Sequence, residues 1–166
     1  MSMPKPYRML GPAAETQLQT GTRYVASIRA KNAESITHAF CARTLEEIAC
    51  LGDGWDGYKG IAPAKTTRLN AWQALREFEA EGLTPNDITP NSNGTISLEW
   101  ETDSAEAYLE VGKTRFSMYI KERGKTSYFD GLATDIPRSI PQLLRRAVDE
   151  AEATKRDFKT RSAFTH

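Results

Sequence analysis

The chain has 166 residues, of which 39% are hydrophobic and 27% are charged, which is enough for one ordinary hydrophobic core and too few for two. Its 22 basic and 22 acidic side chains cancel, which excludes a general attraction to nucleic acid or anionic lipid and leaves only local charged patches. The apolar runs are short and the start "MSMPKPYRML" lacks the apolar stretch of a signal peptide, so we expect a cytoplasmic protein without a membrane anchor.

Residues 1–32 are predicted to form an arm outside the main domain. Prolines and glycines interrupt this segment, and five basic residues stand in it against one acidic residue, Glu15. Within the arm, the alternating pattern of residues 22–30 indicates one short strand. The rest of the arm contains too many breaks for a stable element.

Two helices are expected in the first half of a single domain that we predict over residues 33–156. Between residues 35 and 51, apolar positions recur at intervals of three and four, as they do on one face of a helix. A second helix is expected over residues 63–81, and Gly82 stands where a left-handed cap is needed. The buried face of this second helix is predicted to contain Leu69, Trp72, Leu75 and Phe78, widened by Ala71 and Ala74.

The stretch "LGDGWDGYKG" (51–60) connects the two predicted helices. Glycine reaches the positive φ angles of a chain reversal without steric cost, and a short aspartate side chain can accept hydrogen bonds from nearby backbone amides. We therefore interpret the stretch as a structural corner, in which Asp53 and Asp56 hold the backbone and a buried Trp55 anchors the loop to the core. We assign four glycines to the positive φ angles of this chain reversal: Gly52, Gly54, Gly57 and Gly60.

A calcium-binding loop is the alternative interpretation of the same stretch. Such a loop has acidic ligands at its first, third and fifth positions and a glutamate at its twelfth. Here the two acids are three apart, and the twelfth position from Asp53 is Ala64. We therefore predict no bound metal, and no sequence motif indicates another cofactor.

Cys41 and Cys50 are nine residues apart, a spacing that matches no short metal-binding pair. Both fall in the first predicted helix, which could not bring them together as a disulfide, so we predict two reduced packing residues. His38 lies three residues before Cys41, and a thiolate beside an imidazole is a nucleophile arrangement. Because no oxyanion element or orienting carboxylate accompanies this pair, we predict no catalytic residue.

After residue 94 the apolar period changes from about 3.6 to 2, which indicates strands. Residues 95–101, 105–111 and 114–122 alternate in this way, and residues 125–131 offer a fourth, shorter strand. Because the connections are short, we predict an α+β fold with an antiparallel meander sheet of three or four strands, covered on one face by helices. The buried face of the sheet is predicted to be led by Ile96, Leu98, Trp100, Leu109, Phe116, Met118 and Ile120.

The opposite face of the predicted sheet combines charged residues with two tyrosines. One interpretation is a solvated surface with cross-strand charge pairs. The other is a docking surface for another protein, since tyrosines among charged residues often serve as interface anchors. The candidate protein-binding residues are Glu99, Glu101, Glu106, Tyr108, Glu110, Arg115, Tyr119 and Lys121.

A last helix is predicted to begin near Pro137 and to fade beyond Thr154 into a basic tail, residues 157–166. Its apolar stripe contains Ile140, Leu144, Ala147, Val148 and Ala151, with Leu143 beside it. Basic residues of this region could instead bind nucleic acid, although ordinary pairs such as Arg146 with Glu150 and Glu152 with Arg156 would also explain them. The candidate nucleic-acid-binding residues are Arg145, Arg146, Lys155, Arg156, Lys159 and Arg161.

The motifs "GWDGY", a following proline, an alanine-rich aromatic helix and "NGTISLEW" resemble a widespread, uncharacterised group of small bacterial proteins. That group has a Gly-Trp-Asp-Gly loop and a Gly-x-Ile-x-Leu-x-Trp strand, and it often accompanies plasmids, prophages and other mobile elements. The resemblance covers residues 45–132, and the chain departs from it at Ala64, where a second proline or a serine is expected. It implies the fold and almost nothing about chemistry.

The leading hypothesis is therefore a non-enzymatic cytoplasmic module that binds another protein. By analogy only, the resemblance suggests an inhibitor or regulator of a host system from a phage or mobile element, such as an anti-CRISPR protein or an antitoxin. A small nucleic-acid-binding regulator is the alternative, and an enzyme of unrecognised type is the third. The sequence leaves both a monomer and a homodimer open.

Overall fold

The computed structural model describes residues 38–103 and 105–163, and it describes few side chains after residue 150. The chain divides into two compact units, Met1–Ala39 and Phe40–His166, and the following description concerns the second. The predicted arm, its strand at residues 22–30 and the start of the domain lie outside the described residues. The described elements are a helix over residues 38–49, α2 (Lys65–Glu79), β1 (Asp87–Pro90), β2 (Ile96–Glu101), β3 (Ala105–Val111), β4 (Arg115–Glu122), β5 (Lys125–Leu132) and α3 (Ser139–Ala163).

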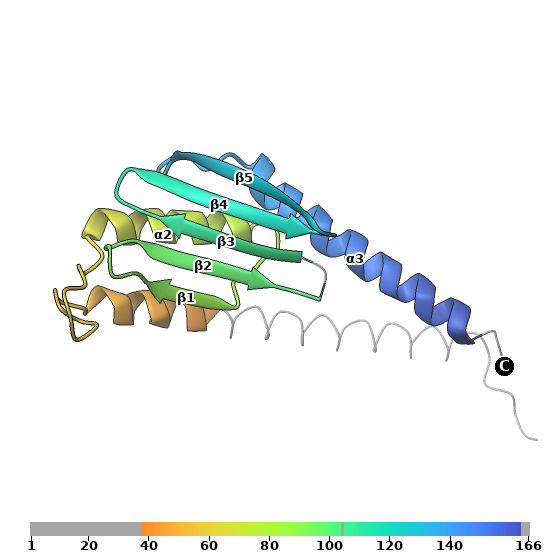
Figure 1. Ribbon diagram of the computed structural model, residues 1–166, viewed down its shortest axis with the longest axis horizontal. Coiled ribbons are helices and arrows are strands. Elements are labelled where there is room, and N and C mark those ends of the chain that lie inside the picture. Colours follow the sequence, from red (N-terminus) through yellow and green to blue (C-terminus); the bar gives the residue numbers. More distant parts are fainter. Residues whose placement is uncertain (1–37, 104, 164–166) are drawn as a thin grey trace, which may run out of the picture. The chain divides into compact units, whose positions relative to one another are not determined.

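The five strands form one antiparallel sheet in the order β1-β2-β3-β4-β5 (Figure 1), which confirms the predicted α+β class and the meander. The strand count was predicted too low because β1 was not recognised as a strand. With four residues and Pro90 at its end, β1 is too short to display a period of two. It belongs to the sheet because Ile88 is buried and pairs with Leu98 of β2.

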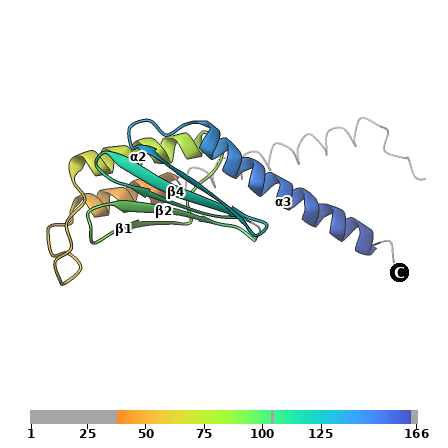
Figure 2. The same cartoon turned by 45° about the horizontal axis from the view of Figure 1, so that its top comes forward.

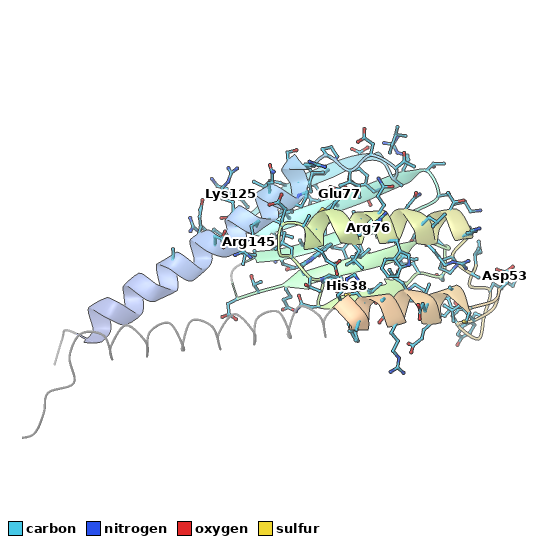
Figure 3. All side chains as sticks on the ribbon, turned by 180° about the vertical axis from the view of Figure 1, so that it is seen from behind. His38, Asp53, Arg76, Glu77, Lys125 and Arg145 are labelled. Atoms are coloured by element: carbon cyan, nitrogen blue, oxygen red, sulfur yellow. The ribbon has the colours of Figure 1, made fainter. Side chains whose placement is uncertain are left out.

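One face of the sheet packs against helices. Figure 3, viewed from behind, shows α2 and residues 40–49 in front of the sheet, whereas in Figure 1 the opposite face of the sheet is turned to the viewer. At the centre of this packing, the Phe78 ring of α2 stacks on Trp100 of β2 with ring centroids 4.4 Å apart. All seven residues predicted to lead the buried face are buried: Ile96, Leu98, Trp100, Leu109, Phe116, Met118 and Ile120.

The buried face of α2 differs from the predicted one. Leu69 is 57% exposed and Trp72 is only partly buried, whereas Leu75 and Phe78 are fully buried as expected. A helix turns by about 100° per residue, so residues repeated every three positions drift around the axis, and Leu69 lies about 180° from Phe78. The observed buried face contains Thr67, Asn70, Ala71, Ala74, Leu75 and Phe78.

The end of α2 follows the prediction, because Gly82 has a φ of +71°. Next to this end, the Gln142 side chain of α3 donates to Glu81 Oε1 at 3.4 Å, and Figure 2 shows α3 beginning beside the end of α2. The predicted stripe on α3 is confirmed for Ile140, Leu144 and Ala147, which are buried.

Helix α3 continues to Ala163, so residues 157–163 of the predicted basic tail are helical rather than frayed. The segment after Thr154 has no glycine or proline, and its lysines and arginines are good helix formers. Helix propensity alone can continue a helix beyond the end of its apolar stripe, and the amphipathic pattern could not show this. Within the described residues, none of the helices combines the length and the apolar character needed to span a membrane.

Candidate functional site

Three tyrosines form a row across the sheet face opposite α2. In the strand register, Tyr108 of β3 lies opposite Tyr119 of β4, and Tyr119 lies opposite Tyr128 of β5. The rings of Tyr108 and Tyr119 are nearly parallel, at 12° with centroids 5.7 Å apart. The Tyr128 ring is tilted by 59° from that of Tyr119 with centroids 6.5 Å apart, and it is 78% exposed. These residues, called the tyrosine row below, make a continuous aromatic surface over three strands.

Tyr119, at the centre of the row, is held by a carboxylate. Its hydroxyl donates to Glu106 Oε1 at 2.7 Å, while the Lys121 ammonium donates to Glu106 Oε2 at 3.3 Å. The hydrogen bond to Glu106, together with desolvation, raises the pKa of Tyr119 to about 12. The hydrogen bonds from Tyr119 and then Lys121 lower the pKa of Glu106. The phenol is therefore neutral and fixed in orientation at neutral pH.

Glutamine at position 106 is expected to lower the pKa of Tyr119 from about 12 toward the ordinary tyrosine value of about 10, because the Glu106→Gln change removes the carboxylate. A spectrophotometric titration of phenolate absorbance would measure the change. Because the folded-state pKa of Tyr119 is raised, the contribution of this contact disappears as the pH rises through about 12. Because the pKa of Glu106 is lowered, the contribution is also lost as the pH falls below the ordinary glutamate range, so it is complete between that range and about pH 10. An unchanged titration in Glu106→Gln, or the same change in a Glu110→Gln control, would contradict the assignment.

Tyr108, at one end of the row, is held by a polar side chain of β2. Its hydroxyl is 2.6 Å from Ser97 Oγ, and the Asn91 amide donates to the same Ser97 oxygen at 2.7 Å. Ser97 is only 1% exposed although it belongs to the sheet face opposite α2. Its burial is stabilised because both neighbours make hydrogen bonds with its hydroxyl.

Glu110 lies beside this group and is also held by neighbours. The Thr95 hydroxyl lies 2.6 Å from Glu110 Oε1, and the Asn93 amide donates to the same carboxylate oxygen at 3.0 Å. The turn between β1 and β2 therefore fixes Glu110 through two side chains. The surface around the tyrosine row is ordered before any partner arrives, which reduces the entropic cost of binding.

All eight predicted docking residues project from the same sheet face. In the strand register, Glu99 of β2 lies opposite Tyr108 of β3. Glu101 of β2 lies opposite Glu106 of β3, which lies opposite Lys121 of β4. Arg115 forms an ion pair with Asp130 of β5, with its Nη2 atom 2.5 Å from Oδ2. The predicted interleaving of tyrosines and charges is thus confirmed as an arrangement in space.

Tyr128 and Asp130 belong to this face and were missed by sequence reasoning. The signal was the two-residue turn at Arg123 and Gly124, which have φ angles of 48° and 78°. Such a turn fixes the register of a hairpin, so it places Tyr128 opposite Tyr119. The alternating pattern of β5 alone does not show which of its two adjacent aromatic residues faces outward.

The same face has a strong excess of negative charge. Glu99 and Glu101 make no ion pair with any other described residue, in contrast to Glu106 and Asp130. The net charge of the outward residues of the five strands is −4, because six are acidic and two are basic. These residues are Asp87, Glu99, Glu101, Glu106, Glu110 and Asp130 against Arg115 and Lys121.

The glycine-rich loop has the predicted corner geometry. Asp56 Oδ1 accepts hydrogen bonds from the amides of Tyr58 at 2.9 Å and Gly60 at 3.0 Å, and these bonds lower the pKa of Asp56. Asp53 Oδ1 accepts from the Ala62 amide at 2.9 Å. Both carboxylates therefore bind backbone. Figure 3 shows Asp53 beyond the start of α2, at the opposite end of that helix from Arg145.

Trp55 does not anchor the loop in the core, and that prediction is wrong. Its side chain is only partly buried and lies outside the core cluster, and its Nε1 donates to the Ile61 carbonyl at 3.4 Å. The loop instead closes on itself and attaches to the β1–β2 turn, where the Ile61 amide donates to Ser92 O at 2.8 Å. Gly54 and Gly57 have the expected positive φ angles of 80° and 82°, whereas Gly52 and Gly60 do not have a positive φ.

Alanine at position 60 is expected to lower the free energy of unfolding by about 1–2 kcal/mol. A Cβ atom there would lie 2.7 Å from the Asp56 carboxylate, which accepts the Gly60 amide hydrogen bond. Gly52→Ala is the matched control, because a Cβ atom at Gly52 meets nothing within 4 Å. Urea denaturation would measure both variants, and an equal effect of the two would show that the Asp56 contact does not constrain the loop.

The two cysteines differ in their surroundings. Cys41 is fully buried in the core, as predicted. Its pKa is raised to about 11, mainly by burial and to a smaller extent by the negative charge of the nearby Glu79. A thiol with such a pKa is a poor nucleophile at neutral pH. Cys50 is exposed, so its prediction as a packing residue is wrong. It lies two residues after the buried Ile48, about 200° around the helix axis, and therefore faces away from the core.

The basic residues of α3 that the structure describes are accompanied by acids. Arg145 pairs with Asp149 through two contacts of 2.5 and 3.1 Å, and Glu150 lies 3.5 Å from Arg123 of the β4–β5 turn. The predicted pair was Arg146 with Glu150, whereas the observed pair across one helical turn is Arg145 with Asp149. The Arg146 side chain is exposed. The side chains of Lys155, Arg156, Lys159 and Arg161 lie outside the described residues.

Comparison of the chain with protein-family models, curated proteins and solved structures gives no match. The resemblance to the uncharacterised bacterial group therefore stays a prediction. Functional inference rests on the residues of the sheet face and on their geometry.

Proposed function

We propose that the protein is a non-enzymatic cytoplasmic module that binds another protein through the sheet face opposite α2. The tyrosine row is the observation that supports this proposal most directly. Tyr128 presents an aromatic ring that is 78% exposed, and Tyr108 and Tyr119 beside it are fixed by hydrogen bonds. Fixed tyrosines with a polar rim are typical anchors of protein interfaces, because they bury a large area with little loss of side-chain entropy.

The charge of the face favours protein over nucleic acid as its partner. An aromatic row on a sheet could also stack against unpaired bases, as it does in several RNA- and DNA-binding folds. Those surfaces surround their aromatic residues with lysine and arginine, whereas this face has a net charge of −4. Phosphate groups would be repelled here. Nucleic-acid binding by the basic residues of α3 remains the alternative function.

The biological setting that we propose follows from the resemblance alone. A small binding module encoded by a phage or another mobile element would act as an inhibitor or regulator of a host system, in the manner of an anti-CRISPR protein or an antitoxin. In this setting the partner is a host protein, and the module acts by occupying one of its surfaces. Such a role needs no catalytic group in the module.

Isolation of the tagged protein from its natural host would test the proposed function. We expect one partner protein to copurify with the unmodified chain and to be reduced at least about tenfold by Tyr128→Ala, since anchor truncation typically costs this much. Tyr58→Ala is the matched control, because Tyr58 is 88% exposed but lies in the glycine-rich loop. Equal recovery of the same partner with both variants would exclude the sheet face as the interface.

A further inference from the structure

We infer that the partner presents an extended basic segment to the tyrosine row, with arginine or lysine side chains about four positions apart and small residues between them. This inference rests on the proposed function and adds the chemistry of the partner. It depends on the distribution of charge on the sheet face and on the spacing of the strands. Both are properties of residues that the structure describes.

The charge of the sheet face favours a basic partner. The whole chain is neutral, yet the outward residues of the five strands have a net charge of −4. Two basic side chains on this face are already paired, Lys121 with Glu106 and Arg115 with Asp130. The carboxylates of Glu99 and Glu101 are exposed and have no ion pair among the described residues. A basic partner would supply the missing counter-charges.

The exposed ring of Tyr128 also favours a cationic side chain. Tyr128 is tilted away from Tyr119, and its side chain is 78% exposed. A guanidinium or ammonium group within about 6 Å of such a ring is attracted by the negative π face. Arginine would suit this position best, since its planar group can also form bidentate hydrogen bonds with a carboxylate. The aromatic and acidic parts of the face therefore favour the same kind of side chain.

The spacing of the strands matches the rise per residue of an extended peptide. Glu99, Tyr108, Tyr119 and Tyr128 occupy one register row across four adjacent strands. Neighbouring strands are about 4.8 Å apart, so the row extends about 14 Å from Glu99 to Tyr128. An extended peptide advances about 3.3 Å per residue and presents alternate residues on the same side. Two basic residues about four positions apart would then reach Tyr128 and Glu99 together.

A peptide binding experiment would test the inference with the full chain. The probe is a fluorescent Gly/Ser peptide of about a dozen residues with arginines about four positions apart, measured by anisotropy at low salt. We expect saturable binding that weakens at least about tenfold in the Glu99→Lys, Glu101→Lys double variant. The matched control is Glu46→Lys with Asp135→Lys, which changes the net charge equally at exposed positions outside the face.

Three results would overturn the inference. These are an absence of binding by the arginine peptide, equal weakening by the two double variants, and equal binding of a peptide with its arginines placed side by side. The proposed function is judged separately, by the copurified host partner and Tyr128→Ala. A host partner that is lost with Tyr128→Ala but retained with Glu99→Lys, Glu101→Lys would leave the docking face intact and exclude the basic segment.

Discussion

Replacing Phe78 with alanine is expected to lower the free energy of unfolding by about 3–5 kcal/mol. The ring is fully buried, and it stacks on Trp100 at 4.4 Å where α2 meets β2. Truncation would leave a cavity between the helix and the sheet that neither element can close, because both are fixed by their own backbone hydrogen bonds. Chemical denaturation monitored by circular dichroism would measure the loss.

Leu69→Ala is the matched control for this prediction, since Leu69 belongs to the same helix but is 57% exposed. Its truncation should change the free energy of unfolding by less than about 1 kcal/mol. Comparing the two variants also distinguishes the predicted orientation of α2 from the observed one. The spacing in the sequence predicted that both side chains are buried, whereas only Phe78 is buried in the structure. If Leu69→Ala were as destabilising as Phe78→Ala, the orientation of α2 described above would be wrong.

Asn70→Ala is expected to lower the free energy of unfolding by about 2–3 kcal/mol, because it removes two partly buried hydrogen bonds at once. The Asn70 amide donates to the carbonyls of Gly112 and Lys113, each at 3.0 Å, and joins α2 to the β3–β4 turn. Alanine would leave the Gly112 carbonyl in a partly buried position without this donor. Equilibrium unfolding in urea would measure the effect.

Gln73→Ala controls for the loss of a side-chain amide on the same helix. The Gln73 amide donates to the Thr134 carbonyl at 3.1 Å, but this contact is exposed and water can replace it. We expect its loss to cost less than about 0.5 kcal/mol. Similar effects of the two variants would mean that the Asn70 contacts do not hold the turn.

The strands of the fold could be predicted because their burial follows the alternation of the sequence. Residues 105–111 show this most clearly, with every second side chain buried. The α2 face was predicted only in part: Ala71 and Ala74 are buried as expected, but Leu69 is exposed, and a buried asparagine gives no hydropathy signal. Asn70 is buried for its hydrogen bonds to the β3–β4 turn, which is 42 residues away in the chain. No local pattern contains that information.

The candidate site was predictable in part for the same reason. Alternation placed Tyr108 and Tyr119 on the outward face, but their adjacency depends on the register between two strands. The hydrogen bond between Tyr108 and Ser97 likewise depends on the pairing of β2 with β3. Trp55 shows the converse error, since a large aromatic residue was expected to be interior, whereas it closes a loop on the surface.

The meander also has a kinetic consequence. Every strand pairs with its neighbour in the chain, and only two to five residues separate consecutive strands. Closing such short loops costs little chain entropy, so each hairpin can form as soon as its second strand is available. Refolding should then be limited by the docking of α2 onto the finished sheet, on a timescale on the order of milliseconds for a mixed domain with mostly local pairings.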